Sequence, residues 1–502
     1  MGFTTSIFLF AFFPLCLLAY ILCDRLSLLK KAGAFLNKIR AKDILLILFS
    51  LAFYMWACFD DVFRLCLYIL LIYLAARWIE TSRKRQLYIN IYKEGQKDGS
   101  QTDKKLFLSL FPFIFAVACL VICLIYYKYS GFLTQLGNTL LGSSNEPQSI
   151  LAPLGLSFIT FSAISYLADI YRGNASAGSL IDCALYITFF PKVISGPIVL
   201  WKDFQAQIKQ RKMSLNLSAD GINRIIIGFA KKVLLADTFG ACLTNIGAQG
   251  IDQLTAFGTL ILYMLQIYYD FAGYSDIAIG LAKLFGFEFK ENFDFPYRSK
   301  SISEFWRRWH ISLGSWFRQY VYFPLGGSRA GLKKTLRNLA VVFALTGIWH
   351  GAGWNYLLWG FINGAMVILE RVIQNKPFYK KTPNFIKYAF TMLIVMLFWQ
   401  LFRFQSLKDT VNLLGTIIGI NRPENIYYTW QYYFDAQMIT FIIIGILGAT
   451  VLGSPRLKTF YGKFSATKGG LIVQQTVLLL LFVLAVLFMI NSTYSPFIYF
   501  QY

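Results

Sequence analysis

Charged residues are scarce in this chain: Asp, Glu, Lys and Arg together make up 15% of its 502 residues. Soluble globular domains typically carry about 25% charged and 45–50% apolar residues, whereas here 57% are hydrophobic and 18% aromatic. So few charges cannot coat a water-facing surface of that size, and so apolar a chain is not disordered. Eight cysteines are too few for a disulfide scaffold of this length. The composition therefore predicts an integral membrane protein.

Several catalytic and metal-binding signatures are missing. His310 and His350 are the only histidines, and neither lies in an H-x-x-x-H or H-E-x-x-H pattern, so no zinc site is indicated. No C-x-x-C occurs, and the cysteines lie in or beside apolar segments, where they are expected to pack as small apolar residues. Neither a phosphate-binding G-x-x-x-x-G-K-[ST] nor a G-x-S-x-G is found, which argues against ATP hydrolysis and an α/β-hydrolase serine. We expect no metal and no permanently bound cofactor.

Acidic residues are outnumbered by basic ones, 25 to 48, for a net charge of +23. Such an excess can indicate a nucleic acid or another polyanionic partner. In a multi-pass membrane protein, however, Lys and Arg collect in the cytoplasmic loops and set the orientation. We therefore expect membrane lipids and no nucleic acid among the partners.

Apolar runs of about 20 residues, the length needed to cross a bilayer, recur along the chain. The candidates are 3–23, 43–59, 62–79, 106–127, 150–170, 225–246, 254–282, 388–404, 437–453 and 471–490. Two further apolar stretches, 180–200 and 340–369, are interrupted by Pro or Gly and are expected to be re-entrant or broken segments. The predicted fold is an all-α polytopic membrane protein with these roughly ten transmembrane helices, two broken segments and interfacial amphipathic helices.

The distribution of Lys and Arg predicts the orientation of the spans. The loops around residues 24–42, 80–105, 201–224 and 287–338 are rich in basic residues and are expected in the cytoplasm. The alternation holds along the chain if both broken segments enter and leave on the cytoplasmic side. Both termini then face outward, in a multi-pass protein of the cell inner membrane.

His350 lies within the second broken segment, in the sequence Gly-Ile-Trp-His-Gly. An ionisable residue at membrane depth is by default a candidate functional residue, and a desolvated histidine stays neutral and can act as a base. The alternative is a neutral histidine that bridges two helices by hydrogen bonds.

His310 lies in a stretch whose aromatic residues share one face at helical spacing, from Phe305 to Tyr320. With Arg307, Arg308 and Arg318 nearby, this pattern predicts an amphipathic helix at the cytoplasmic interface. The alternative is a membrane-surface anchor in which the histidine has no chemical role.

Asp270 and Asp276 are charges within an apolar run. Six residues apart on a helix, they face directions about 240° apart, so a shared two-carboxylate site is not expected. Each is better explained as an acceptor for Tyr, Arg or backbone donors.

Several long motifs in this order resemble the membrane-bound O-acyltransferase superfamily, from about residue 150 to 405. They are Pro153–Phe158, Ser195–Ile198, Tyr269–Asp276, Asn292–Phe293 with Pro296–Tyr297, Phe305–Leu313 and Gly347–Gly351. The chain is similar in particular to a bacterial branch that includes alginate and peptidoglycan O-acetyltransferases and the teichoic acid D-alanyl transferase. The resemblance divides the chain into N-terminal helices (1–149), a catalytic core (150–405) and C-terminal helices with an aromatic tail (406–502).

The resemblance implies an acyltransferase with a membrane-embedded funnel, in which His310 and His350 are the catalytic residues. It implies acetyl-CoA as the donor substrate on the cytoplasmic side and a polysaccharide of the cell envelope as the final acceptor. An extracytoplasmic SGNH-type acetyltransferase is the expected partner. The chain end Phe497–Tyr502 is similar to an acyl-carrying F-x-Y-x-x-F tail, which implies Tyr499 as an acyl relay; the alternative is an aromatic belt at the interface.

Acyl transfer from a thioester needs a nucleophile, a base and donors for the oxyanion. We assign the base to His350 and donor positioning to His310. Residues with positive charge or large rings near His310 are candidates for holding the donor, namely Arg307, Arg308, Trp306 and Trp309, with Lys300 as a further candidate. Residues expected to line or support the site are Asp270, Asp276, Tyr274 and Trp349.

Three other interpretations remain at this point. One is a D-alanyl or other acyl transferase of the same superfamily. Another is a transporter or lipid flippase, which would also have broken helices and buried charges. The third is a scaffold for an extracellular enzyme, in which both histidines can be replaced without loss.

Overall fold

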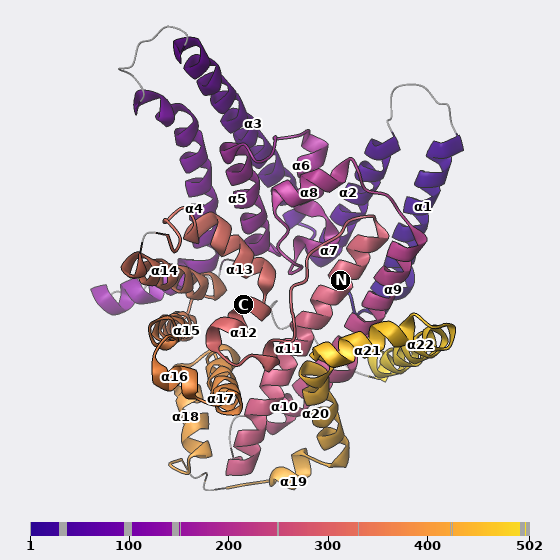
Figure 1. The fold of residues 1–502 in the computed structure, drawn as a ribbon, viewed down its shortest axis with the longest axis vertical. Coiled ribbons are helices and arrows are strands. Elements are labelled where there is room, and N and C mark those ends of the chain that lie inside the picture. Colours follow the sequence, from indigo (N-terminus) through magenta and orange to yellow (C-terminus); the bar gives the residue numbers. More distant parts are fainter. Residues whose placement is uncertain are drawn as a thin grey trace. The chain divides into compact units, whose positions relative to one another are not determined.

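The computed structural model describes residues 2–29, 38–94, 103–142, 150, 152–247, 250–329, 331–421, 423, 425–491 and 497. Every regular element in these ranges is a helix, which confirms the all-α prediction. Contacts divide the chain into two compact units. Figure 1 shows the helices, coloured from the N-terminus to the C-terminus. The first unit comprises residues 3–221 with 281–290, and the second 222–280 with 291–502. These boundaries differ from the sequence-based division at residues 149 and 405.

The helices of the first unit are η1 (Phe8–Phe12), α1 (Phe13–Leu29), α2 (Lys38–Ala57), α3 (Asp61–Glu94), α4 (Asp103–Leu141), α5 (Leu156–Arg172), α6 (Leu180–Thr188), α7 (Phe190–Val193) and α8 (Trp201–Ile208). Two helices belong partly to each unit, α9 (Leu215–Ala230) and α11 (Gln253–Leu284). The helices of the second unit are η2 (Lys231–Ala236), α10 (Asp237–Ile246), η3 (Pro296–Arg298), α12 (Ile302–Arg308), α13 (Ile311–Phe317), η4 (Arg318–Tyr322), α14 (Leu332–His350), α15 (Trp354–Ile373), α16 (Pro377–Lys381), α17 (Asn384–Arg403), α18 (Leu407–Ile417), α19 (Trp430–Tyr433), α20 (Ala436–Ala449), η5 (Val451–Gly453), α21 (Pro455–Ser465) and α22 (Lys468–Asn491).

Seven helical stretches within the described ranges are long and apolar enough to cross a membrane. They are Phe8–Arg25, Asp61–Tyr88, Ser109–Leu141, Trp354–Ile373, Asn384–Arg403, Ala436–Gly453 and Lys468–Asn491. Six of them match expected spans, and the protein is a multi-pass membrane protein. The other four expected spans form α2, α5, α9 with α10, and α11. Those helices are either shorter than 18 residues or contain buried charged residues.

The first broken segment, 180–200, is interrupted in the first unit as expected. Helix α6 ends at Thr188, α7 has only four residues, and the chain then continues without helix to Leu200. Gly196 permits this path, because a Cβ there would lie 2.5 Å from the carbonyl oxygen of Pro191.

The second broken segment, 340–369, is interrupted at two of its glycines, as expected. Helix α14, of 19 residues, ends before Gly351, and α15, of 20 residues, begins after Gly353. The two helices lie side by side in the second unit (Figure 1). Gly347 differs from the prediction, because it lies within α14 and permits close packing there: a Cβ would lie 2.7 Å from the carbonyl oxygen of Tyr356.

Candidate active site

His310 lies at a break between two helices of the second unit. The sequence predicted one amphipathic helix here, but α12 ends at Arg308 and α13 begins at Ile311. His310 itself has φ 45° and ψ 54°, in the left-handed region that residues other than glycine rarely adopt. The prediction of a continuous helix is wrong, because periodic spacing does not reveal whether the backbone continues. Such strained residues cost about 1–3 kcal/mol and cluster at functional sites.

A short non-helical stretch that follows α11 braces this break. The N–H of Ile311 donates to the carbonyl oxygen of Asn292 at 2.9 Å, and the N–H of Asp294 donates to the carbonyl oxygen of Arg308 at 3.0 Å. The guanidinium of Arg308 also pairs with the carboxylates of Asp294 at 2.8 Å and Glu304 at 3.0 Å. Backbone groups that the break removes from the helical pattern thus have partners.

The imidazole of His310 is buried, with 2% of the residue exposed. Its Nδ1 lies 3.1 Å from Oδ1 of Asn292, and the ring of Phe271 meets it edge-on at a centroid distance of 4.7 Å. Its Nε2 is buried and has no hydrogen-bond partner within the part of the chain that the structure describes. Burial lowers the pKa of His310 from 6.5 to about 3, so the ring is neutral at physiological pH.

A cavity of about 360 Å³ in the second unit has His310 in its wall. Three sequence-predicted donor candidates, Trp306, Arg307 and Trp309, also line it. Its other walls are mainly apolar side chains from the helices around it, namely Leu313, Phe317, Leu339, Val342, Phe343 and Val367. The indole N–H of Trp306 is buried without a hydrogen-bond partner among the described residues. Two residues of the cavity wall, Trp306 and His310, thus each have a buried ring nitrogen without a hydrogen-bond partner among the described residues.

Arginines form part of the rim of this cavity. Arg307, Arg318 and Arg371 line it and are exposed to solvent. The candidates Arg308 and Lys300 are not among its lining residues, and Arg308 is held in the ion pairs described above. Sequence reasoning missed Arg371, whose only signal is a basic residue in the last turn of a mainly apolar helix.

His350 lies at the C-terminal end of α14 and is buried, with 6% of the residue exposed. Three aromatic rings surround its imidazole: Trp349 at a centroid distance of 4.6 Å, Trp359 at 5.1 Å and Phe402 at 4.8 Å. Trp359 and Phe402 meet the imidazole edge-on, at 84° and 81°. His350 is not among the residues that line the cavity beside His310.

Aromatic contacts connect the surroundings of the two histidines. Trp359, which touches His350, contacts Trp306 of the cavity wall at 5.4 Å between ring centroids. A second route runs from Phe402 to Trp399 at 5.7 Å and on to Trp309 at 4.7 Å. The structure therefore brings both histidines to one aromatic cluster of the second unit, although they lie on different helices.

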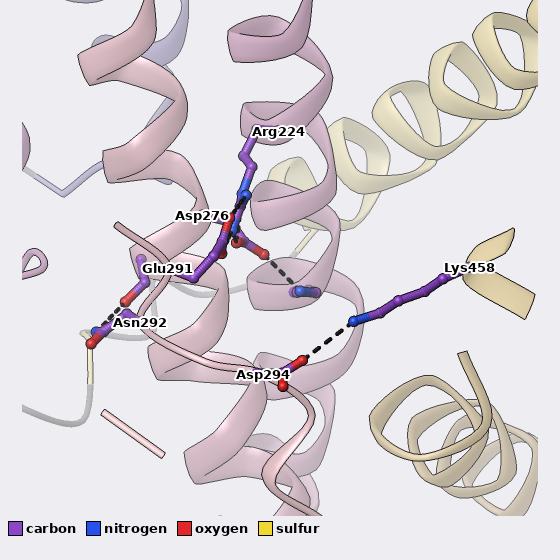
Figure 2. Close-up of polar contacts among 8 residues, drawn as sticks. Arg224, Asp276, Glu291, Asn292, Asp294 and Lys458 are labelled. Carbon is purple, nitrogen blue, oxygen red and sulfur yellow. Dashed lines mark hydrogen bonds and ion pairs between the residues drawn. The ribbon is translucent and has the colours of Figure 1, made fainter. Parts of the chain in front are cut away.

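The carboxylate of Asp276 in α11 belongs to an ion-pair network with α9 and η2 (Figure 2). Arg224 donates to it from Nε at 2.9 Å and Nη2 at 2.7 Å, and Lys231 pairs with it at 2.6 Å. Arg224 also binds Glu291, the residue directly before Asn292. The network thus fixes the chain next to the residue that contacts His310.

Asp270 has a separate ion pair. The ammonium of Lys232 lies 2.8 Å from its carboxylate and 2.6 Å from that of Asp237. The two aspartates of α11 therefore face different cations, and neither forms a shared carboxylate site with the other.

The sequence matches the model of the membrane-bound O-acyltransferase family over residues 86–412. This chain belongs to that family. It is 36% identical over 401 residues to a probable alginate O-acetylase, AlgI, of Pseudomonas putida, which covers 75% of this chain and 81% of the relative. It is 32% identical over 329 residues to a peptidoglycan O-acetyltransferase of Helicobacter pylori, covering 59% of this chain and 62% of the relative. A teichoic acid D-alanyltransferase of Streptococcus thermophilus is 32% identical over 256 residues, covering 48% of this chain and 61% of the relative.

The protein is accordingly an O-acyltransferase. Phe497, near the end of the chain, lies in the surroundings of His310. Phe497 is buried, stacks on Tyr274 at 4.7 Å and contacts Phe271 at 5.8 Å between ring centroids. Phe271 is the residue whose ring meets the imidazole of His310. The relay candidate Tyr499 lies outside the described residues.

Asn292 is a site residue that sequence reasoning named only as part of a motif. Its side chain contacts Ser275 in α11 and both His310 and Ser312 at the start of α13, so it joins two separate stretches of the chain. No spacing rule relates Asn292 to a histidine 18 residues away, so only the structure reveals this contact.

Proposed function

We propose that this acyltransferase takes an acetyl group from cytoplasmic acetyl-CoA and passes it across the inner membrane for O-acetylation of an extracytoplasmic polysaccharide. The observation that carries the proposal is the cavity beside His310. It combines an apolar interior, a rim of arginines and an unsatisfied imidazole nitrogen. Relatives that act on alginate and peptidoglycan support a polysaccharide as the final acceptor.

The rim of the cavity suits the charged end of the donor. Arg307, Arg318 and Arg371 each offer a planar guanidinium, which binds phosphate oxygens in bidentate geometry. Coenzyme A carries its phosphates at the end of the molecule away from the thioester. In the proposal, the phosphates bind the arginines of the rim and the thioester arm enters the apolar interior. This placement matches the polarity of the cavity.

His310 is the base in this proposal, because it lines the donor cavity and its buried Nε2 has no hydrogen-bond partner among the described residues. It removes the proton of an acceptor hydroxyl while the hydroxyl oxygen forms the new C–O bond to the acetyl carbon. The C–S bond then breaks, and the proton passes from Nε2 to the departing thiolate, which leaves as free coenzyme A. The N–H of Trp306 supplies a donor for the oxyanion of the tetrahedral intermediate.

His350 was assigned the base from sequence alone, and that assignment stays a prediction. Within its aromatic surroundings, His350 can instead support the acceptor side of the reaction. The two assignments differ in which histidine substitution abolishes proton transfer.

The acceptor side of the proposal involves the C-terminal tail. Phe497 contacts Phe271, whose ring meets the imidazole of His310. In the proposal, the hydroxyl of Tyr499 carries the acetyl group to an extracytoplasmic SGNH-type transferase.

The decisive experiment is incubation of the purified protein with acetyl-CoA labelled in the acetyl group. Release of free coenzyme A together with labelled protein, lost in a His310→Gln and His350→Gln double variant, supports the proposal. Turnover of a D-alanyl thioester but not acetyl-CoA would indicate the D-alanyl branch instead. Uptake of a substrate into vesicles without any thioester cleavage would refute acyl transfer and favour a transporter.

A further inference from the structure

Asn292 holds a central place among the polar groups next to His310. It is buried, with 1% of the residue exposed, and its side chain makes hydrogen bonds in several directions. The amide nitrogen donates to Oγ of Ser275 at 3.0 Å. The amide oxygen accepts from the backbone N–H of Ser312 at 3.2 Å and from its hydroxyl at 2.8 Å.

The orientation of this amide follows from the backbone. The N–H of Ser312 can only donate, so the atom of Asn292 that faces it must be the oxygen. A flipped amide would place two donors against each other and leave a buried N–H unsatisfied, at a cost of about 1–3 kcal/mol. The same oxygen is the atom that lies 3.1 Å from Nδ1 of His310.

This contact determines where the proton of His310 resides. Because the amide oxygen can only accept, Nδ1 of His310 must carry the hydrogen. A neutral imidazole has one N–H, so Nε2 of this cavity-lining residue keeps its lone pair and is an acceptor. The hydroxyl of Ser312, 3.4 Å from Nδ1, gives its own hydrogen to Asn292 and can share the Nδ1 hydrogen as an acceptor.

We propose that Asn292 is a positioning residue that fixes the Nδ1–H form of His310 and thereby keeps Nε2 free to accept a proton. The proposal rests on the function proposed above for its catalytic consequence, but not for the position of the proton. Asn292 acts through His310 and has no contact with the donor cavity among the described residues.

The position of Asn292 is itself fixed by its chain neighbours. Its carbonyl oxygen accepts the N–H of Ile311, and Arg224 binds the preceding residue, Glu291 (Figure 2). Two residues later, Asp294 pairs with Arg308 and with Lys458 of α21. The stretch from Glu291 to Asp294 therefore stabilises both the side-chain amide of Asn292 and the left-handed backbone of His310.

An amide in this place has a different effect from a carboxylate. Asn292 directs the proton but carries no charge, so it does not stabilise an imidazolium. A carboxylate accepts the same Nδ1–H and also raises the pKa of the imidazole. An aspartate at position 292 has the same shape and can keep these hydrogen bonds, because the hydroxyl of Ser275 can rotate and donate to the second carboxylate oxygen.

Other charged groups around His310 set the background for any pH effect. The cations that share its cavity are Arg307 on α12, Arg318 on η4 and Arg371 on α15. On α11, Asp276 follows Ser275 but is paired with Arg224 and Lys231. None of these groups changes between the wild type and the Asn292 variants.

A direct test is practical because the entire chain has only two histidines. Protein labelled with ¹⁵N in the histidine rings gives two imidazole spin systems, and His310→Gln identifies which one belongs to His310. We expect the wild type to carry the proton of His310 on Nδ1. A proton on Nε2 in the wild type would overturn the proposal, whatever the activity of the protein.

The variants separate positioning from a purely structural role. Asn292→Ala should let the proton move to Nε2 and lower kcat for acetyl transfer by about 10- to 100-fold, the range found for residues that orient metal-binding histidines, with KM for acetyl-CoA nearly unchanged. Asn292→Asp should keep the Nδ1–H form and retain more activity than Ala. In Asn292→Asp the raised pKa of His310 leaves more of this base protonated at low pH. The acid limb of the pH–rate profile of this variant therefore moves to higher pH.

Ser275→Ala is the matched control, because it removes the hydrogen bond on the far side of the amide but leaves the Oδ1 contacts. The proton of His310 should stay on Nδ1 in this variant. An Nδ1–H form that persists in folded Asn292→Ala would refute the positioning role. If the proton moves as expected but no variant, nor the wild type, cleaves acetyl-CoA, the positioning stands and the proposed function fails.

Discussion

Replacement of His310 by Gln should remove the base of the reaction while retaining the shape of the cavity. A positioned base contributes about 10²–10⁴-fold to a rate, which corresponds to about 3–5 kcal/mol of activation free energy at 1.36 kcal/mol for each factor of ten. Gln can replace the hydrogen bond to Asn292 but cannot take a proton at neutral pH. We therefore expect kcat for acetyl transfer to fall at least about 100-fold, and KM for acetyl-CoA to change little.

The assay is a steady-state measurement of free coenzyme A released by purified wild type, His310→Gln and His350→Gln. If His310 is the base, its Gln variant should lose more activity than the same change at His350. The reverse order would refute our reasoning and return the base to His350. A large rise in KM for acetyl-CoA in His310→Gln would instead indicate a role in donor binding.

Burial of the His310 imidazole also predicts how the free energy of unfolding depends on pH. Because burial lowers the pKa of His310 from 6.5 to about 3, the unfolded chain binds a proton in this interval that the folded protein does not. Stability associated with His310 is therefore complete above pH 6.5 and is lost as the pH falls toward 3. His310→Gln should make the fall of the unfolding free energy shallower by up to about 1.4 kcal/mol per pH unit, measured by denaturant unfolding in detergent. An unchanged slope would mean that His310 is not desolvated.

Three further predictions concern other parts of the second unit. Arg371→Ala should raise KM for acetyl-CoA by roughly 10-fold with kcat nearly retained, as expected for the loss of one charge-assisted phosphate contact of about 1.5–3 kcal/mol; Arg456→Ala on α21, outside the cavity, is the control, and equal effects would exclude a specific role. Gly347→Ala should lower the melting temperature, because its Cβ would lie 2.7 Å from a carbonyl oxygen of α15 and overpacking costs about 1–3 kcal/mol. Gly469→Ala has nothing within 4 Å of its Cβ and should leave the melting temperature unchanged or higher; a similar loss in both variants would contradict the packing argument. Tyr499→Phe should abolish polymer acetylation in cells without loss of expression, and mass spectrometry should find an acetyl ester on the C-terminal peptide of the wild type only; full activity in the Phe variant would eliminate the relay.

The helical secondary structure and the insertion into a membrane could be predicted from the sequence, because both depend on local composition. An apolar run of about 20 residues crosses a bilayer in almost any context, since the backbone must satisfy its hydrogen bonds internally. The same local reasoning located the interruption near Pro191. It was less successful at Gly347, because a glycine that breaks a helix and one that lets two helices touch look alike in sequence.

The candidate residues were accessible from sequence through rarity and motif. With His310 and His350 as the only histidines, few groups could serve as a base, and both lie in the motifs that indicated the family. Their chemical roles were not accessible. Those depend on which ring nitrogen bears the proton and which faces the cavity, and both are set by neighbours distant in sequence.

The sequence by itself thus determined that the chain is an all-α membrane protein, which family it belongs to, and which residues can carry the chemistry. Only the tertiary structure decided that the backbone breaks at His310, that Asn292 meets its Nδ1, and that Arg371 joins the rim of the cavity. The physical reason is the range of the interactions. Hydrophobic periodicity acts within one helix, whereas the hydrogen bonds and ion pairs that orient a buried side chain join segments that only folding brings together.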